Sequence, residues 1–341
     1  MDAHQAEPVL VTGAAGFIGF HLSRALLQAN VPVVGLDNCN AYYSPQLKRD
    51  RLARLRQWPR FQFVEMDLAR NGDCAALFAR TRFSAVVHLA AQAGVRYSLE
   101  NPAAYINSNL VGFGHVLEGC RHQQTSHLIY ASSSSVYGAN RKLPFAETDS
   151  VDHPVSLYGA TKKANELMAH TYSHLFGLPC TGLRFFTVYG PWGRPDMAYW
   201  TFTRKILAGE PLQVFNHGRM GRDFTYVDDV VDALVRLLPK PPQTQPQSMD
   251  AQPTAATSTA PWRVFNIGNQ TPVPLLEFIR ILEEVLGKKA AVEFMPMQAG
   301  DVRQTHADAS ALQQAVGFQP STRLQDGLAQ FAAWYRTYHN C

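Results

Sequence analysis

Short hydrophobic runs alternate with helical periods through the first half of this chain. Apolar segments typical of buried strands lie at 9–12, 33–37, 61–65, 85–89, 128–131 and 181–185. The segments between them carry the hydrophobic spacing of helices. Because such alternation builds a parallel sheet covered on both faces, the pattern predicts a Rossmann-type doubly wound α/β fold.

After residue 187 the pattern loosens into shorter strands and helices, which include 212–215, 264–267, 275–286 and 324–338. We therefore expect residues 1–187 to form the nucleotide-binding sheet domain and residues 188–341 to form mainly a smaller C-terminal α/β part that binds the substrate. The stretch 239–261 is rich in Pro, Gln, Ser, Thr and Ala. That composition predicts a mobile surface insertion.

A glycine turn follows the first strand and opens a helix. The spacing of Gly13, Gly16 and Gly19 allows a tight turn, a close approach to a pyrophosphate and close packing of helix on strand. Asp37 ends the second strand about 20 residues further on, where a carboxylate binds a ribose hydroxyl. Since Asp37, followed by Asn38, would repel a 2′-phosphate, we expect NAD rather than NADP.

A second constellation joins a serine-rich strand end to a later helix. Ser133, Ser134 and Ser135 follow a strand, and Tyr158 and Lys162 lie four residues apart, so they share one helix face. An ammonium group near a phenol lowers the pKa of the phenol, which suits a general acid/base beside a nicotinamide. The Tyr-x-x-x-Lys spacing is common on helices, and its combination with the glycine turn makes it informative.

Composition excludes several other classes. A length of 341 residues is enough for about two domains. The net charge of +4 is spread along the chain, which gives little support for nucleic acid or membrane as a partner. Five widely spaced cysteines without a CxxC pair predict reduced thiols in the cytoplasm and no metal site. The first eight residues lack the apolar core of an export signal.

Taken in order, these motifs resemble the extended short-chain dehydrogenase/reductase family over nearly the whole chain. The resemblance implies that Ser133, Tyr158 and Lys162 are catalytic. The cofactor-binding residues that it implies are Gly13, Gly16, Phe17, Ile18, Gly19, Asp37, Asn38, Asp67, Leu68, Ala90, Ala91, Gln92, Asn109, Tyr158, Lys162 and Phe185.

Longer segments at 93–98, 184–198 and 216–219 narrow the resemblance to the UDP-glucuronate 4-epimerase group of that family. It implies reversible NAD-dependent conversion of UDP-glucuronate to UDP-galacturonate through a 4-keto intermediate, and a homodimer formed by the helices at 103–122 and 158–176. The substrate-binding residues that it implies are Arg96, Ser133, Ser134, Ser135, Thr187, Arg194, Arg222, Asp301 and Arg303. Arg303 stands where such enzymes often carry proline, so its role is open.

Other functions stay open at this point. Related decarboxylases resemble this chain, but they have a glutamate just before the valine of the Val-Tyr-Gly segment, where this chain has Ser135. Related 4,6-dehydratases have an Asp-Glu pair at the positions of Ser134 and Ser135. Hydroxyls can hold a carboxylate that an acid would repel. The alternatives are a 4-epimerase of UDP-glucose or UDP-N-acetylglucosamine, a UDP-glucuronate decarboxylase, and a nucleotide-binding regulator on a retired enzyme fold.

Overall fold

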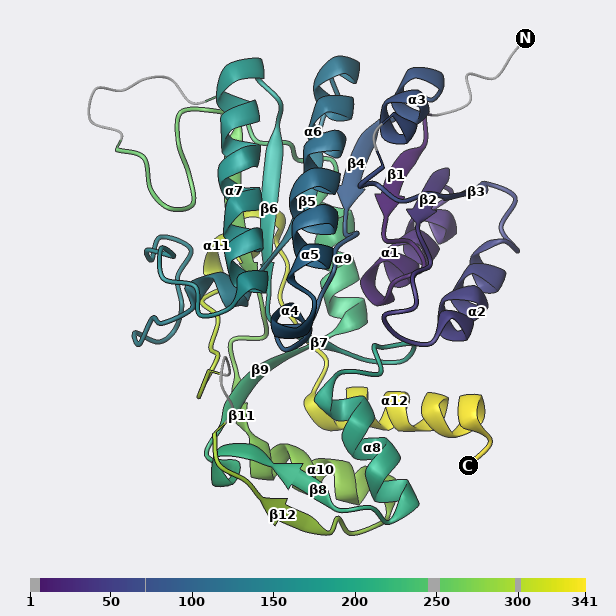
Figure 1. The fold of residues 1–341 in the computed structure, drawn as a ribbon, viewed down its shortest axis with the longest axis vertical. Coiled ribbons are helices and arrows are strands. Elements are labelled where there is room, and N and C mark those ends of the chain that lie inside the picture. Colours follow the sequence, from purple (N-terminus) through teal and green to yellow (C-terminus); the bar gives the residue numbers. More distant parts are fainter. Residues whose placement is uncertain (1–6, 71, 245–251, 298–301) are drawn as a thin grey trace.

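A parallel seven-stranded sheet in the order β10-β6-β5-β4-β1-β2-β3 forms the centre of the computed structural model, which describes residues 7–70, 72–244, 252–297 and 302–341 (Figure 1). Its strands are β1 (Val9–Thr12), β2 (Val33–Asp37), β3 (Phe61–Glu65), β4 (Ala85–His88), β5 (Leu128–Ser133), β6 (Cys180–Phe185) and β10 (Trp262–Ile267). The predicted doubly wound fold is confirmed. The order reverses between β1 and β4, and the crevice at their carboxyl ends is where such folds bind ligands.

Helices cover both faces of the sheet. One face carries α1 (Phe17–Gln28), α2 (Pro45–Leu55) and α9 (Val227–Leu237), and the other carries α3 (Asp73–Arg80), α6 (Gly112–Gln123) and α7 (Leu157–Phe176). Successive side chains of β1 alternate between the two cores: Val9 and Val11 are buried in the first and Leu10 in the second. This two-sided burial explains why the strands read as continuous apolar runs.

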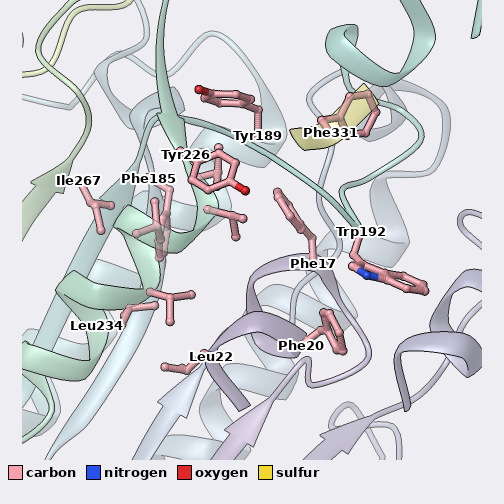
Figure 2. Close-up of a cluster of buried hydrophobic side chains, with 14 of the residues drawn as sticks. Phe17, Phe20, Leu22, Phe185, Tyr189, Trp192, Tyr226, Leu234, Ile267 and Phe331 are labelled. Carbon is pink, nitrogen blue, oxygen red and sulfur yellow. The ribbon is translucent and has the colours of Figure 1, made fainter. Parts of the chain in front are cut away.

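The larger core joins the sheet domain to the segment that follows β7 (Thr187–Tyr189) and to the last helix, α12 (Leu324–His339) (Figure 2). Phe20 of α1 and Trp192 have ring centroids 5.6 Å apart, and Trp192 lies 5.1 Å from Trp334 of α12. Figure 2 shows Phe17 and Phe20 on the α1 side, with Tyr189 and Phe331 above them in this view. The segment that leads to Arg194 is therefore packed against the first helix of the sheet domain.

Smaller elements lie below the large sheet in Figure 1. A three-stranded sheet contains β7 (Thr187–Tyr189), β9 (Gly221–Tyr226) and β11 (Pro272–Pro274), and a two-stranded one contains β8 (Leu212–Val214) and β12 (Val292–Phe294). The helices α8 (Ala198–Ala208) and α10 (Leu275–Leu286) also lie here. Helix α11 (Ser310–Val316) instead contacts β10 and α9 of the sheet domain. Within the described ranges, the helices are too short or too polar to cross a membrane.

The boundary expected at residue 187 does not divide the structure cleanly. β10 pairs with β6 along its whole length, and α9 packs on α1, so two elements of 188–341 complete the sheet domain. In the stretch 239–261, residues 252–261 are described and differ from the expected loose insertion. Ala256 and Ala260 are buried, and the Ser258 hydroxyl is hydrogen-bonded to the ring of His170 at 3.0 Å. Small side chains fit there between α7 and the edge strand.

Candidate active site

A cavity of about 430 Å³ is lined by residues of both parts, including the carboxyl ends of β1, β2, β4, β5 and β6. The predicted site residues that line it are Gly13, Gly16, Phe17, Ile18, Gly19, Asp37, Asn38, Asp67, Leu68, Ala90, Ala91, Gln92, Ser133, Ser134, Ser135, Tyr158, Lys162, Phe185, Thr187, Arg194 and Arg222. Three others, Asn109, Arg96 and Arg303, do not line the cavity, and Asp301 lies outside the described residues.

The glycine turn forms a backbone cradle at one end of the cavity. Gly13 has a φ of +74°, and a Cβ atom there would lie 2.8 Å from the nitrogen of Ala90. A Cβ on Gly19 would lie 2.1 Å from the carbonyl oxygen of Gly13, which is not possible without movement of the backbone. The N-terminus of the 12-residue helix α1 follows, with its unpaired N–H groups. These features fit the pyrophosphate of a dinucleotide.

Asp37 closes the other edge of this cofactor region. Its carboxylate accepts hydrogen bonds from the backbone N–H groups of Ala15 at 3.1 Å and Cys39 at 2.9 Å. Burial raises its pKa, and the charges of Lys48 and Arg51, with these hydrogen bonds, oppose that rise. Neither cation could be placed near Asp37 from the sequence, because both belong to a different element, α2.

Asn109 was expected to bind the cofactor, but it does not line the cavity and instead lies behind Gln92, which does. Its side chain accepts from the N–H of Gln92 at 2.8 Å and donates to the Gln92 carbonyl oxygen and to the Thr161 hydroxyl, each at 3.1 Å. It lies in a π-helical stretch, Ile106–Val111, and such irregular turns often mark functional sites. Asn109 thus connects the turn after β4 to the helix that carries Tyr158 and Lys162.

Ser133, Tyr158 and Lys162 meet at the end of β5. All three line the cavity, and Lys162 donates to the carbonyl oxygen of Ala131 at 2.8 Å. Burial lowers the pKa of Lys162 to about 8. Burial also raises the pKa of Tyr158, while the neighbouring Ser133 hydroxyl and the charge of Arg194 lower it. Arg194 is a cation that lowers the pKa of this phenol, and the expected effect of the Lys162 charge stays a prediction.

The serine run forms a short turn at the cavity wall. Ser133 accepts a hydrogen bond from the N–H of Ser135 at 3.2 Å and its hydroxyl lies 3.2 Å from the Ser135 hydroxyl, which caps the 3₁₀ turn Ser134–Tyr137. The serines therefore have two roles at once: they form this turn, and they line the cavity. Thr187, the first residue of β7, lines the same cavity.

The remaining predicted substrate residues have different positions. Arg222 lines the cavity and donates to the carbonyl oxygens of Gly221 at 2.9 Å and Arg303 at 3.2 Å. Arg303 has an exposed side chain, and its carbonyl oxygen also accepts from the N–H of Gly221 at 3.0 Å. Arg303 therefore contacts Arg222 through its main-chain carbonyl oxygen. The Arg96 guanidinium lies 5.3 Å from the ring centre of Phe215.

Arg51 is a residue near the site that sequence reasoning missed. It is fully buried and donates to the carbonyl oxygens of Ala15 at 2.8 Å, Trp192 at 2.6 Å and Gly193 at 2.7 Å. It thereby joins the glycine turn to the segment just before Arg194. On a helix with many basic residues, a buried arginine has the same local pattern as a solvated one, so the sequence carried no signal for it.

The parallel sheet, the glycine cradle and the Ser-Tyr-Lys set together define a protein of the extended short-chain dehydrogenase/reductase class. The chain belongs to the NAD-dependent epimerase/dehydratase family, whose sequence model matches residues 9–251. It is 52% identical to Protein CapI of Staphylococcus aureus, across 97% of this chain and 99% of that protein. It is 50% identical to UDP-glucuronate 4-epimerase 3 of Arabidopsis thaliana, across 97% of this chain and 77% of that protein.

The fold is also similar to that of a solved enzyme, UDP-glucuronic acid 4-epimerase from Bacillus cereus in complex with UDP-glucuronic acid and NAD. The two chains are 34% identical, the TM-score is 0.84, and the match covers 97% of this chain and 99% of the other. These relatives confirm the family that the sequence motifs predicted.

Proposed function

We infer that this chain catalyses the reversible NAD-dependent 4-epimerisation of UDP-glucuronate to UDP-galacturonate through a 4-keto intermediate. The observation that carries this inference is the hydroxyl-lined wall of Ser133, Ser134, Ser135 and Thr187, in the same cavity as Tyr158 and the glycine cradle. A neutral donor wall suits a uronate, and relatives that match nearly the whole chain are named for this reaction.

The acid/base work falls to Tyr158. When bound, NAD supplies a reversible hydride acceptor for the hydrogen on C4 of the sugar. The phenolate of Tyr158 takes the proton of the 4-hydroxyl as the ketone forms, and it returns a proton to that oxygen when the ketone is reduced on its other face. Ser133 lines the same cavity and can donate a hydrogen bond to the same oxygen. The reaction has no net change in oxidation state.

The hydroxyl wall also protects the intermediate. A ketone at C4 lies β to the C6 carboxylate, so the intermediate loses CO₂ if the bond to the carboxyl carbon aligns with the ketone π system. We propose that Ser134, Ser135 and Thr187 donate hydrogen bonds that hold the carboxylate out of that alignment, with Arg194 beside the same group. An acidic side chain at the same place would repel the carboxylate or supply protons to the decarboxylated product.

Other roles follow from position along the cavity. We propose that Arg222 binds the pyrophosphate of the UDP-sugar, with its guanidinium held by the carbonyl oxygens of Gly221 and Arg303. Arg96 is proposed as a further phosphate or carboxylate contact. That Asp301 lies near the nucleotide of the UDP-sugar stays a prediction. Five cysteines that form no disulfide suit a reducing compartment, and we propose a cytoplasmic enzyme.

We propose that the enzyme is a homodimer. Large apolar side chains are exposed on the two helical segments expected to pair: Ile106 and Val111 are each 41% exposed, and Leu167 of α7 is 57% exposed. Pairing with a second copy would bury them in a four-helix bundle. Leu167→Glu should convert the dimer to a monomer in light scattering. Leu276→Glu, on an exposed apolar residue of α10, is the control and should leave the mass unchanged.

The direct test of the activity is to incubate the purified protein with UDP-glucuronate, with and without added NAD, and to separate the products with mass detection. A new UDP-sugar of unchanged mass that approaches a reversible mixture supports the proposal. Loss of CO₂ as the main reaction would make the enzyme a decarboxylase. Turnover of only UDP-glucose or UDP-N-acetylglucosamine would assign it to a neutral sugar.

A further inference from the structure

The buried guanidinium of Arg51 links two parts of the cavity wall. It makes five hydrogen bonds, as many as a guanidinium has N–H groups, and all of them go to neutral oxygen atoms. Nη1 donates to the carbonyl oxygen of Ala15 and to the Tyr43 hydroxyl, each at 2.8 Å. Nε and Nη2 donate to the carbonyl oxygen of Trp192 at 3.1 and 2.6 Å, and Nη2 also donates to that of Gly193 at 2.7 Å. Because the guanidinium is planar and rigid, these bonds fix the acceptor oxygens relative to one another.

On the cofactor side, Arg51 holds the glycine turn. The N–H of Ala15 donates to the Asp37 carboxylate at 3.1 Å, so Ala15 is bound through both its N–H and its carbonyl group. The next residue, Gly16, is the N-cap of α1 and lines the cavity. Arg51 therefore supports the backbone cradle that fits a pyrophosphate.

On the substrate side, Arg51 holds a turn that is unfavourable without support. Trp192 has a φ of +59°, in the left-handed region that a residue with a Cβ atom rarely adopts. Two nitrogens of Arg51 donate to its carbonyl oxygen and hold it in this conformation. The following residues contact Tyr199: a Cβ atom on Gly193 would overlap the Tyr199 hydroxyl, and the N–H of Arg194 donates to that hydroxyl at 3.2 Å. The turn thereby fixes the backbone that carries the Arg194 side chain, which lines the cavity.

We propose that Arg51 is a positioning residue that fixes Arg194 relative to the glycine cradle, and so links cofactor binding to recognition of the uronate carboxylate. The inference rests on the proposed function, because only a uronate brings a carboxylate beside Arg194. Carbon C6 of the uronate is two bonds from C4, so a displaced Arg194 displaces the reacting carbon as well. A ligand that orders the glycine turn should also order the Arg194 turn, because one rigid group binds both.

Equilibrium binding to the Tyr158→Phe protein with saturating NAD tests the proposal without turnover. Arg51→Lys keeps the positive charge, but a single ammonium group cannot hold both segments in the way that the planar fork does. It should weaken binding of UDP-glucuronate about tenfold, the value of roughly one charge-assisted hydrogen bond, and leave the affinity for UDP the same within about twofold. UDP is the reference because it has no carboxylate. Arg60→Lys is the matched control, because Arg60 donates to the carbonyl oxygen of Asn30 outside the cavity.

Equal losses of affinity for UDP and UDP-glucuronate would show that Arg51 only supports the fold, and they would overturn the proposal. So would unchanged affinities for both ligands. Failure of the protein with Arg51 and Tyr158 intact to epimerise UDP-glucuronate would instead overturn the proposed function, so the two failures are distinct.

Hydrogen exchange gives a second readout that needs no substitution, so it decides the proposal even where Arg51→Lys does not fold. ADP carries a pyrophosphate without the nicotinamide. When ADP is added to the NAD-free protein, exchange should slow several-fold in residues 190–197 as well as in the glycine turn. In Arg51→Lys, ADP should protect the glycine turn alone. Protection confined to the glycine turn in the unaltered protein would overturn the proposal.

Discussion

Glu166 and Arg184 form a two-pronged ion pair inside the protein, with Nε to Oε1 at 2.8 Å and Nη2 to Oε2 at 2.9 Å. Both side chains are at most 1% exposed. Ser132 donates to the same Glu166 oxygen at 2.6 Å, so the pair links α7 to the ends of β5 and β6. The helix that carries Tyr158 is thereby held against the strand that ends in Ser133.

Breaking this pair should destabilise the fold. Glu166→Gln leaves the Arg184 charge buried without its partner, and we expect a loss of about 3–5 kcal/mol in the free energy of unfolding. Chemical denaturation measures it. Glu277→Gln removes a partner of Arg280 in an exposed pair on α10 and should change stability little. Equal effects of the two substitutions would contradict the structural role of the buried pair.

Loss of the Tyr158 hydroxyl should remove the chemistry and spare binding. We expect Tyr158→Phe to lower kcat by about 10²–10⁴, because the proton-transfer group is absent, while NAD still binds. Turnover assays and cofactor quantification check both parts. Tyr338→Phe, which removes a phenol hydroxyl outside the cavity, should keep near-normal turnover. Substantial turnover by Tyr158→Phe would reject the assigned role.

Removal of the Thr187 hydroxyl should loosen the uronate carboxylate. Thr187→Ala should therefore raise the share of decarboxylated product, measured by mass detection after a single incubation with UDP-glucuronate. Thr337→Ala removes an exposed hydroxyl that only bonds the helix carbonyl of Ala333, and it serves as the control. A product ratio identical to that of the unaltered enzyme would count against the hydroxyl wall.

The buried His88 side chain should make the folded protein less stable in acid. Burial, and secondly the charge of Lys162, lower its pKa from 6.5 to about 3, and its Nδ1 is hydrogen-bonded to Thr12 at 2.8 Å. Below pH 6.5 the unfolded chain takes up a proton that the folded chain does not, so stability falls as the pH falls toward about 3. At about pH 5 this group alone costs roughly 2 kcal/mol relative to neutral pH.

Denaturation curves of His88→Asn at neutral pH and at about pH 5 check this prediction. The variant should lose less stability between the two conditions than the unaltered protein, by roughly that 2 kcal/mol. Since the other histidines are the same in both proteins, the difference reports His88. An equal loss in both proteins would show that its protonation does not limit acid stability.

Features with a local signature were predictable from the sequence. The strand ends, the glycine turn and the Ser-Tyr-Lys set each depend on spacing within one segment, and the helix expected at 275–286 has those bounds as α10. The alternation of elements predicts a parallel sheet, whose strands share one carboxyl edge, so Gly13 after the first strand and Ser133 at the end of β5 were expected near one cavity.

Contacts between distant segments were not predictable in this way. The bonds of Arg51 to Trp192, 141 positions away, and of Tyr42 to Asp196 depend on how loops meet after folding. A buried arginine and an exposed one look alike in a helical pattern. The return of β10 to the edge of the large sheet was missed for a related reason: a single apolar strand carries no mark of the sheet it joins.

The most direct test of the central claim uses UDP-glucuronate that carries deuterium at C4 of the sugar. The account predicts a slowed reaction and UDP-galacturonate that keeps the deuterium at C4, because the hydrogen leaves and returns as hydride within one bound cofactor. Release of the deuterium to water, or an unslowed reaction that changes another carbon, would contradict 4-epimerisation at this site.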